Sequence, residues 1–290
     1  MFAITGVTGQ VGGVVARALL AAGQRVRAVL RDPARGAAWA AQGCEIALAD
    51  MRDAAALTRA FAGAQAVFVL LPPVFDPAPG YPESRAAIGA LNEALLAARP
   101  TRVVCLSTIG AHAAEDNLLQ QLGIMERELR TLPMPVAFVR AAWFMENAAW
   151  DVGSALADGE IASFLQPLDR PVPMVATADV GRVAADLLRD TGTGVRIVEL
   201  EGPRRTTPNE IAETFSRVLG STVRARAVPR DTWDALFRAQ GMRYPQPRIR
   251  MLDGFNEGWI DFAAPADTVK GTVPLETVLR GLVERASARG

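Results

Sequence analysis

Three glycines near the amino terminus are the first residues whose spacing could serve chemistry. Gly6, Gly9 and Gly12 separate the apolar run at residues 2–5 from a helical pattern at residues 11–22. A glycine loop between a strand and a helix lets backbone N–H groups approach a pyrophosphate at the positive end of the helix. A glycine triplet alone also fits an ordinary tight turn, but the strand before it and the helix after it favour a dinucleotide site.

The end of the next apolar run indicates which dinucleotide to expect. NAD enzymes usually place Asp or Glu there, to accept a hydrogen bond from the 2′-hydroxyl of the adenosine ribose. This chain reads AVLRDP, with Arg31 at that position and Arg35 close behind. A guanidinium suits a 2′-phosphate through paired hydrogen bonds, so the pattern favours NADP(H). The alternative is that Asp32 binds the ribose while Arg31 is solvated.

Two residues after the third apolar run complete the expected adenosine site. Asp50 and Met51 end that run and would flank the adenine. Asp50 could instead only cap the helix that starts near Asp53.

The elements that must position these residues alternate along the first half of the chain. Apolar runs typical of buried parallel strands occupy residues 2–5, 26–30, 45–48, 66–70, 102–106 and 136–140. Helical patterns lie between them, at residues 11–22, 34–41, 54–61, 83–98 and 119–132. This alternation predicts an α/β fold with right-handed crossovers, a doubly wound parallel Rossmann sheet over residues 1–150.

The pattern loosens in the second half. We expect residues 151–290 to form a smaller C-terminal α+β subdomain that caps the sheet and contacts substrate. One or two of its strands, including residues 195–200, would add to the main sheet. Thr207, Pro208, Glu210 and Gly220 predict one helix with a capping box and a glycine end. Two further amphipathic helices are expected at residues 231–240 and 275–289.

A proline-rich loop, PPVFDPAPGYP at residues 72–82, directly follows the fourth predicted strand. Loops at the carboxyl ends of parallel strands border the ligand crevice, so this loop either forms part of its rim or is a stiff surface connection.

Composition excludes several classes of protein. Among 290 residues, 31 basic side chains balance 31 acidic ones, which leaves no electrostatic footprint for nucleic acid or an anionic membrane. The longest apolar stretches are too short to span a bilayer, and the amino terminus lacks a signal-peptide pattern. Cys44 and Cys105 suit a reducing compartment, so a cytoplasmic location is expected. The single histidine lacks the Cys or His neighbours of a metal site, and no metal is expected.

The opening TGVTGQVGG, the RDP that follows the second predicted strand, and IMERELRTLPMPVAFVRAAWFMEN resemble the NmrA-like group of atypical short-chain dehydrogenases/reductases. That group includes redox-sensing regulators, NAD(P)H:quinone oxidoreductases, triphenylmethane reductases and isoflavone-reductase-like enzymes. The resemblance implies a nicotinamide cofactor that lies across Leu71 and Pro72, Ser107 and Thr108, and residues 141–144. The cofactor contacts expected from the loop and the resemblance together are Gly6, Thr8, Gly9, Gln10, Val11, Gly12, Arg31, Asp50, Met51, Leu71, Pro72, Ser107, Thr108, Ala142 and Trp143.

The usual proton-transfer pair of short-chain dehydrogenases is missing. Those enzymes use a Tyr-x-x-x-Lys pair, but this chain has one lysine, Lys270, and two tyrosines, Tyr81 and Tyr244. Many members of the group keep a lone lysine before the helix that reads LGIMERELR here, and this chain has Leu122 at that position.

Several other residues remain candidates for the site. His112 could supply a proton near neutral pH, or it could be a loop histidine bonded to backbone. Glu126 is expected to be an exposed or packing carboxylate and not a base. Phe144 and Met145 would line an apolar substrate pocket beside Trp143, or belong to ordinary core. Asn147 could orient the cofactor carboxamide or end a turn.

A site without a strong proton donor suits hydride delivery to an acceptor that needs no proton at the same moment. Quinones and similar flat aromatic electrophiles are such acceptors. The sequence therefore predicts an NADPH-dependent reductase of a small aromatic molecule. The alternative is a non-catalytic NADP(H) sensor that acts through a protein partner. Whether the chain is a monomer or a homodimer is left open.

Overall fold

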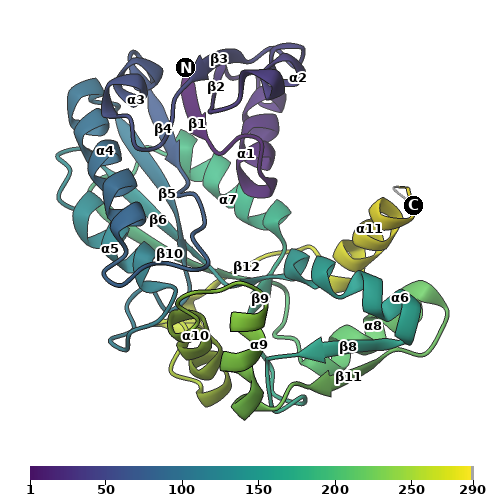
Figure 1. Cartoon of the computed structure of the whole chain (residues 1–290). Coiled ribbons are helices and arrows are strands. Elements are labelled where there is room, and N and C mark those ends of the chain that lie inside the picture. Colours follow the sequence, from purple (N-terminus) through teal and green to yellow (C-terminus); the bar gives the residue numbers. More distant parts are fainter. Residues whose placement is uncertain (289–290) are drawn as a thin grey trace.

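The structure, a computed structural model, describes residues 1–288 and has an eight-stranded parallel sheet at its centre (Figure 1). The strands follow the order β12-β10-β6-β5-β4-β1-β2-β3. They are β1 (Phe2–Thr5), β2 (Val26–Leu30), β3 (Glu45–Leu48), β4 (Ala66–Val69), β5 (Arg102–Thr108), β6 (Val136–Ala141), β10 (Val195–Glu201) and β12 (Val269–Lys270). The predicted α/β class and the doubly wound parallel sheet are confirmed.

Helices cover both faces of this sheet. On one face lie α3 (Ala54–Phe61), α4 (Pro82–Ala98) and α5 (Gln120–Leu129), which share a hydrophobic core with the strands (Figure 1). On the other face α1 (Gln10–Ala21) packs beside α7 (Thr177–Arg189). These two helices approach closely, because a Cβ atom on Gly181 of α7 would lie 2.5 Å from the Cβ atom of Val14. A glycine is therefore needed at that crossing.

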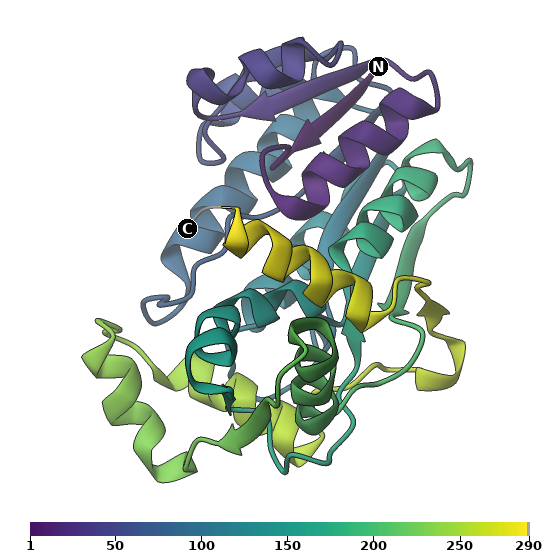
Figure 2. The same ribbon diagram turned by 90° about the vertical axis from the view of Figure 1, so that its right-hand side faces the viewer.

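The smaller subdomain lies at the carboxyl ends of the strands (Figure 2). Two short parallel sheets belong to it, one formed by β7 (Trp143–Phe144) and β9 (Met174–Val175), the other by β8 (Glu160–Ser163) and β11 (Arg224–Ala227). Its helices are α6 (Val152–Asp158), α8 (Pro208–Leu219), α9 (Trp233–Ala239), α10 (Gln246–Glu257) and α11 (Leu275–Ser287). Short 3-10 helices are η1 (Pro33–Arg35), η2 (Met145–Trp150), η3 (Arg230–Thr232) and η4 (Pro265–Asp267).

The chain after residue 150 does not stay within this subdomain. It adds β10 and β12 to the main sheet and places α7 against α1. Residues on both sides of residue 150 thus build the main sheet and the helices that cover it. The division of the chain into two domains at residue 150 stays a prediction.

Most predicted elements form, with a few differences. The helix expected at residues 34–41 is split into η1 and α2 (Ala37–Ala40), because Asp32 caps a 3-10 turn first. The helix expected at residues 119–132 ends at Leu129, shortly before Pro133. The capping box of α8 is confirmed: Thr207 Oγ1 accepts from Glu210 N, and Glu210 accepts from Thr207 N. α11 ends at Ser287, and its predicted last residue, Arg289, lies outside the described residues. None of the helices within residues 1–288 combines the length and apolarity that a bilayer crossing requires.

Candidate cofactor and substrate site

The glycine loop joins β1 to α1 through very close backbone contacts. Gly6 has a positive φ of 61°, and the N–H of Gly9 donates to the Gly6 carbonyl oxygen at 2.9 Å. A Cβ atom on Gly12 would lie only 2.3 Å from that same oxygen. Gly6 and Gly12 are therefore required by the backbone path itself. Gly9 differs, because it is exposed and its Cβ would keep 3.3 Å from Gly6.

The N-terminus of α1 fits a bound anion. Gly9 is the N-cap residue and has no side chain that could accept from the first N–H groups. The first turn carries no acidic residue that would oppose an incoming phosphate. Free N–H groups and the positive end of the helix dipole are what a pyrophosphate needs. Thr8, Gln10 and Val11 line this loop, so the residues present fit a dinucleotide.

Two exposed arginines lie where the sequence predicts the adenosine ribose of a cofactor. Arg31 follows β2, and Arg35 donates from Nη2 to the Thr8 carbonyl oxygen at 3.2 Å. The Asp32 carboxylate accepts from Ala34 N at 2.9 Å, so it already serves as the cap of η1. Asp32 therefore has a capping role beside two exposed arginines, and the choice between a 2′-phosphate and a 2′-hydroxyl stays a prediction.

Asp50 and Met51 follow β3 at the same edge. The Asp50 carboxylate accepts from Arg52 N at 2.9 Å and from Arg52 Nε at 3.2 Å. The backbone hydrogen bond from Arg52, then its side chain, holds the pKa of Asp50 below its usual value. Asp53 caps α3 by accepting from Ala56 N, so Asp50 does not have the capping role that the sequence left open.

The residues expected near the nicotinamide follow the ends of β4, β5 and β6. Thr5 joins β1 to β4: its Oγ1 donates to the Phe68 carbonyl oxygen at 3.0 Å and accepts from Leu70 N at 2.9 Å. Leu71 and Pro72 come next along the chain. Because strand order reverses between β1 and β4, this is the point where ligands bind in open α/β sheets.

Ser107 is buried, and its hydroxyl donates to Glu126 Oε1 at 2.5 Å. That hydroxyl is used inside the protein, whereas Thr108, the last residue of β5, is half-buried. Glu126 itself is 2% exposed, so of the two expected alternatives the structure shows the packing carboxylate and not the exposed one.

A buried ion cluster lies beneath these strand ends. Arg140 of β6 donates to Glu126 from Nε at 3.0 Å and from Nη2 at 2.7 Å. Its Nη1 contacts Glu199 of β10 at 3.2 Å and the Nδ1 atom of His112 at 3.3 Å. Burial acts to lower the pKa of Arg140, but the hydrogen bonds and charges of Glu126 and Glu199 outweigh it and raise that pKa. Sequence reasoning missed this cluster, although an arginine inside the apolar run AFVRAAW was a signal that a buried partner exists.

Cys105 lies next to the cluster and is fully buried. Burial, and then the charge of Glu126, raises the pKa of its thiol, so the residue stays neutral.

The three residues expected to line the apolar pocket differ in burial. Met145 lies in the core, whereas Trp143 and Phe144 are half-buried and form an aromatic wall. Met145 is 2% exposed and packs toward Gly202, which is the core alternative that the sequence left open. Trp143 is half-buried, with its ring edge-to-face with Phe255 of α10 at 5.3 Å between centroids. Phe144 and Asn147 are also half-buried, Asn147 within η2. Ala142, between β6 and the wall, is buried.

The proline-rich loop connects the two parts of the molecule. Its Asp76 accepts from Arg243 N at 2.8 Å and from Tyr244 N at 2.7 Å, in the turn before α10. The loop thus spans from the end of β4 to the smaller subdomain, as the rim alternative requires. At its end the Tyr81 hydroxyl donates to the Asn117 carbonyl oxygen at 3.0 Å. Burial, and then Asp116, raises the pKa of Tyr81, the opposite of what a catalytic tyrosine needs.

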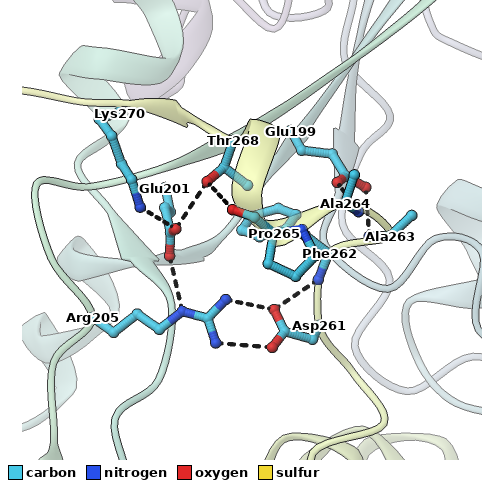
Figure 3. A network of polar contacts seen from close by, with 10 residues as sticks. All are labelled: Glu199, Glu201, Arg205, Asp261, Phe262, Ala263, Ala264, Pro265, Thr268 and Lys270. Atoms are coloured by element: carbon cyan, nitrogen blue, oxygen red, sulfur yellow. Dashed lines mark hydrogen bonds and ion pairs between the residues drawn. The ribbon is translucent and has the colours of Figure 1, made fainter.

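The single lysine serves a structural network (Figure 3). Lys270 pairs with buried Glu201, which also accepts from Thr268 Oγ1 at 3.0 Å and from Arg205 Nε at 3.2 Å. Arg205 in turn forms two 2.8 Å hydrogen bonds with Asp261. Lys270 therefore holds the segment before α11 to β10. It does not replace the lysine whose position on α5 is taken by half-buried Leu122.

The same segment fixes Glu199. Figure 3 shows its carboxylate beside Ala263 and Ala264, whose N–H groups donate to it at 3.0 and 3.1 Å. Glu199 therefore belongs both to this network and to the Arg140 cluster.

Comparison with known proteins identified relatives that share this architecture. The model of the NmrA-like family matches residues 1–258. A (4-alkanoyl-5-oxo-2,5-dihydrofuran-3-yl)methyl phosphate reductase of Streptomyces griseus is 34% identical over 250 residues, 85% of this chain and 83% of that protein. An NAD(P)H azoreductase of Xenophilus azovorans is 29% identical over 286 residues, 96% of this chain and 93% of that protein. The NADPH-dependent quinone oxidoreductase of Escherichia coli, solved with NADPH, superposes with a TM-score of 0.81 at 22% identity, covering 97% of this chain and 99% of that one.

Proposed function

Because the chain belongs to the NmrA-like family, we propose that it is an NADPH-dependent reductase of quinones or similar flat aromatic electrophiles. The observation that carries the proposal is the glycine loop, where an uncapped helix N-terminus lies beside two exposed arginines. NADPH supplies a hydride when it is bound. The protein would bind the cofactor and hold the substrate beside it.

The cofactor contacts divide by the chemistry of the ligand. The loop from Gly6 to Gly12, with Thr8, Gln10 and Val11, would bind the pyrophosphate through backbone N–H groups. Arg31 and Arg35 would bind the 2′-phosphate. Asp50 and Met51 would flank the adenine. The residues proposed to lie along the nicotinamide are Leu71, Pro72, Ser107, Thr108, Ala142 and Trp143. Ser107 would not donate to the cofactor, because its O–H already donates to Glu126.

Substrate choice follows from the wall beside the expected nicotinamide. Phe144 and Trp143 present half-buried aromatic rings, and the Phe255 ring packs edge-to-face against that of Trp143. Flat conjugated molecules pack well on such surfaces. The compared reductases act on a furanone, an azo compound and a quinone, all of which are conjugated acceptors. Asn147 is proposed to orient the carboxamide of the cofactor.

The use of Tyr81 and Lys270 elsewhere supports an acceptor of this kind. Both groups already have structural partners, Asn117 for the tyrosine and Glu201 for the lysine. A quinone that accepts hydride becomes a stable anion, and water can protonate it afterwards. An alcohol would need a base during the transfer, so alcohol oxidation is not the proposed reaction.

Cofactor titration combined with a turnover assay tests the proposal. Arg31→Ala should weaken NADPH binding by about 1.5–3 kcal/mol, the size of a charged hydrogen bond, and leave NADH nearly unchanged. Arg35→Ala should act in the same direction. Arg59→Ala, which removes an exposed arginine at the far end of α3, serves as the matched control and should bind both cofactors normally.

Two results would count against the proposal. Equal losses of NADPH and NADH in the Arg31 variant would show that this residue does not read the phosphate. Tight NADPH binding with no turnover on a panel of quinones and azo dyes would favour the alternative function, a non-catalytic NADP(H) sensor. A sensor would then bind a protein partner with an affinity that depends on NADPH.

A further inference from the structure

His112 lies where the carboxyl ends of two central strands meet. Its turn begins directly after β5: Ile109 N donates to the Ala141 carbonyl oxygen at 2.8 Å, and Ala111 N donates to that of Thr108 at 3.2 Å. The turn therefore runs beside the end of β6, just before Trp143 of the aromatic wall. His112 is exposed and is the only histidine of the chain.

The ring of His112 contacts a group that can only donate. Arg140 Nη1 lies 3.3 Å from His112 Nδ1. A guanidinium has five N–H donors and no acceptor, so Nδ1 must be the unprotonated, accepting nitrogen. The proton of the neutral ring then sits on Nε2, which points in a different direction from the arginine. An imidazolium would place an N–H group against the guanidinium and lose the hydrogen bond.

The arginine cannot easily turn away from this contact. It is 5% exposed, and both oxygens of Glu126 accept from it. Its second buried partner is Glu199, which accepts from Nη1 at 3.2 Å. The Ser107 hydroxyl donates to Glu126 Oε1, which also accepts from Arg140 Nε. Three polar groups, from β5, α5 and β10, thus fix the Arg140 N–H that meets His112.

We infer that Arg140 positions His112 as the neutral ring protonated on Nε2, and that this N–H donates a hydrogen bond to the substrate oxygen that becomes negative during reduction. The inference rests on the proposed function, because it assigns a role within that reaction. Fixed donors aimed at a developing oxyanion stabilise it without any reorganisation at the moment of reaction. His112 is then the residue that contacts substrate, and Arg140 acts through it.

The proton balance distinguishes this role from acid catalysis. NADPH, a quinone and one proton give NADP⁺ and a hydroquinone. Two electrons and one proton move together as hydride to the quinone, which becomes the hydroquinone anion. The added proton comes from water afterwards. The imidazole keeps its own proton throughout, so no base is needed to reload it.

The tautomer can be measured without any activity. Protein without a histidine tag, labelled with ¹⁵N-histidine, contains a single imidazole, and two-bond ¹H–¹⁵N spectra report which nitrogen carries the proton. At pH 8 the ordinary histidine pKa of about 6.5 has been passed, so an unconstrained ring is also neutral. We expect the ¹⁵N chemical shift of Nδ1 to be that of a fully unprotonated nitrogen. In the denatured chain the shift of Nδ1 should instead be an average over the two tautomers. A protonated Nδ1, or an average like that of the denatured chain, would overturn the inference.

Single-turnover reduction of a quinone at saturating NADPH tests the donor. His112→Ala should slow hydride transfer by about 100-fold, the lower end of the cost of losing one oxyanion donor. His112→Gln keeps a side-chain N–H donor and should lose clearly less than the alanine variant. NADPH affinity should be unchanged in both. Glu115→Ala, an exposed change in the same turn, should behave as the parent protein.

The outcomes separate this inference from the proposed function. Equal rates in the Ala and Gln variants, or no loss in either, would contradict the donor role of His112 but not the proposed reductase function. Absence of turnover in the parent protein would remove the donor role together with the proposed reaction. A wrong tautomer would overturn the positioning by Arg140 even in an active enzyme.

Discussion

Replacing Gly12 by alanine tests how closely the glycine loop is packed. The added Cβ would lie 2.3 Å from the Gly6 carbonyl oxygen, 2.6 Å from its carbon and 3.0 Å from the Thr5 carbonyl oxygen. All three atoms belong to the backbone, so no side chain can move aside. The first turn of α1 must shift away from the end of β1, and with it the N–H groups proposed to bind pyrophosphate.

The magnitude follows from two opposing effects. Overpacking in a well-packed region costs about 1–3 kcal/mol, and a contact against backbone belongs at the upper end. Alanine also favours a helix over glycine by about 1 kcal/mol, which offsets part of that cost. The net expectation is a decrease of about 2 kcal/mol in the free energy of unfolding, or a Tm lower by about 4–8 °C.

Thermal denaturation with a matched glycine provides the assay. Gly89 lies exposed within α4, and a Cβ atom there would meet nothing within 4 Å. Gly89→Ala should therefore raise the free energy of unfolding by about 0.5–1 kcal/mol through helix preference alone. Gly9→Ala should leave stability nearly unchanged but weaken NADPH binding. A stabilised or unchanged Gly12→Ala variant would refute the close approach of α1 to β1.

Two further predictions concern the carboxylates of buried Glu126 and half-buried Asp151. Glu126→Ala removes the main partner of Arg140 and should lower the free energy of unfolding in urea by about 3–5 kcal/mol, whereas exposed Glu128→Ala should change it by less than about 0.5 kcal/mol. A small loss at Glu126 would contradict the buried cluster. Burial raises the pKa of Asp151 to about 6, so the native state binds a proton more tightly than the unfolded chain, and stability falls as pH rises from about 4 to 6. Asp151→Asn should therefore stabilise the protein by about 1–3 kcal/mol at pH 7.5 and not at pH 3.5, and equal effects at both would contradict the burial of this carboxyl.

Contacts between residues near in sequence were predictable. The capping box of α8 joins Thr207 to Glu210, three residues apart, so the sequence contains the whole hydrogen-bonding pattern. The glycine spacing at residues 6, 9 and 12 likewise describes one strand-to-helix turn. Apolar runs and helical periodicity determined which stretches form the parallel sheet, because each must bury one or both faces. Where local signals competed, as at Gly36 between η1 and α2, the boundary was missed.

Contacts between residues far apart in sequence depended on the tertiary structure. Arg140 meets Glu126 at a separation of 14 residues and Glu199 at 59, and Lys270 meets Glu201 at 69. The types of these residues show that buried charges need partners, but not which of 31 acidic side chains each will find. The sheet decides that choice, because the register pairs Arg140 with Glu199 and with Ser107 on neighbouring strands. The sequence by itself thus determined which stretches form the strands and the glycine loop, because the signals for both lie within short stretches of the chain. Only the folded sheet decided what His112 faces, since that depends on three distant strands and one helix meeting at a single point.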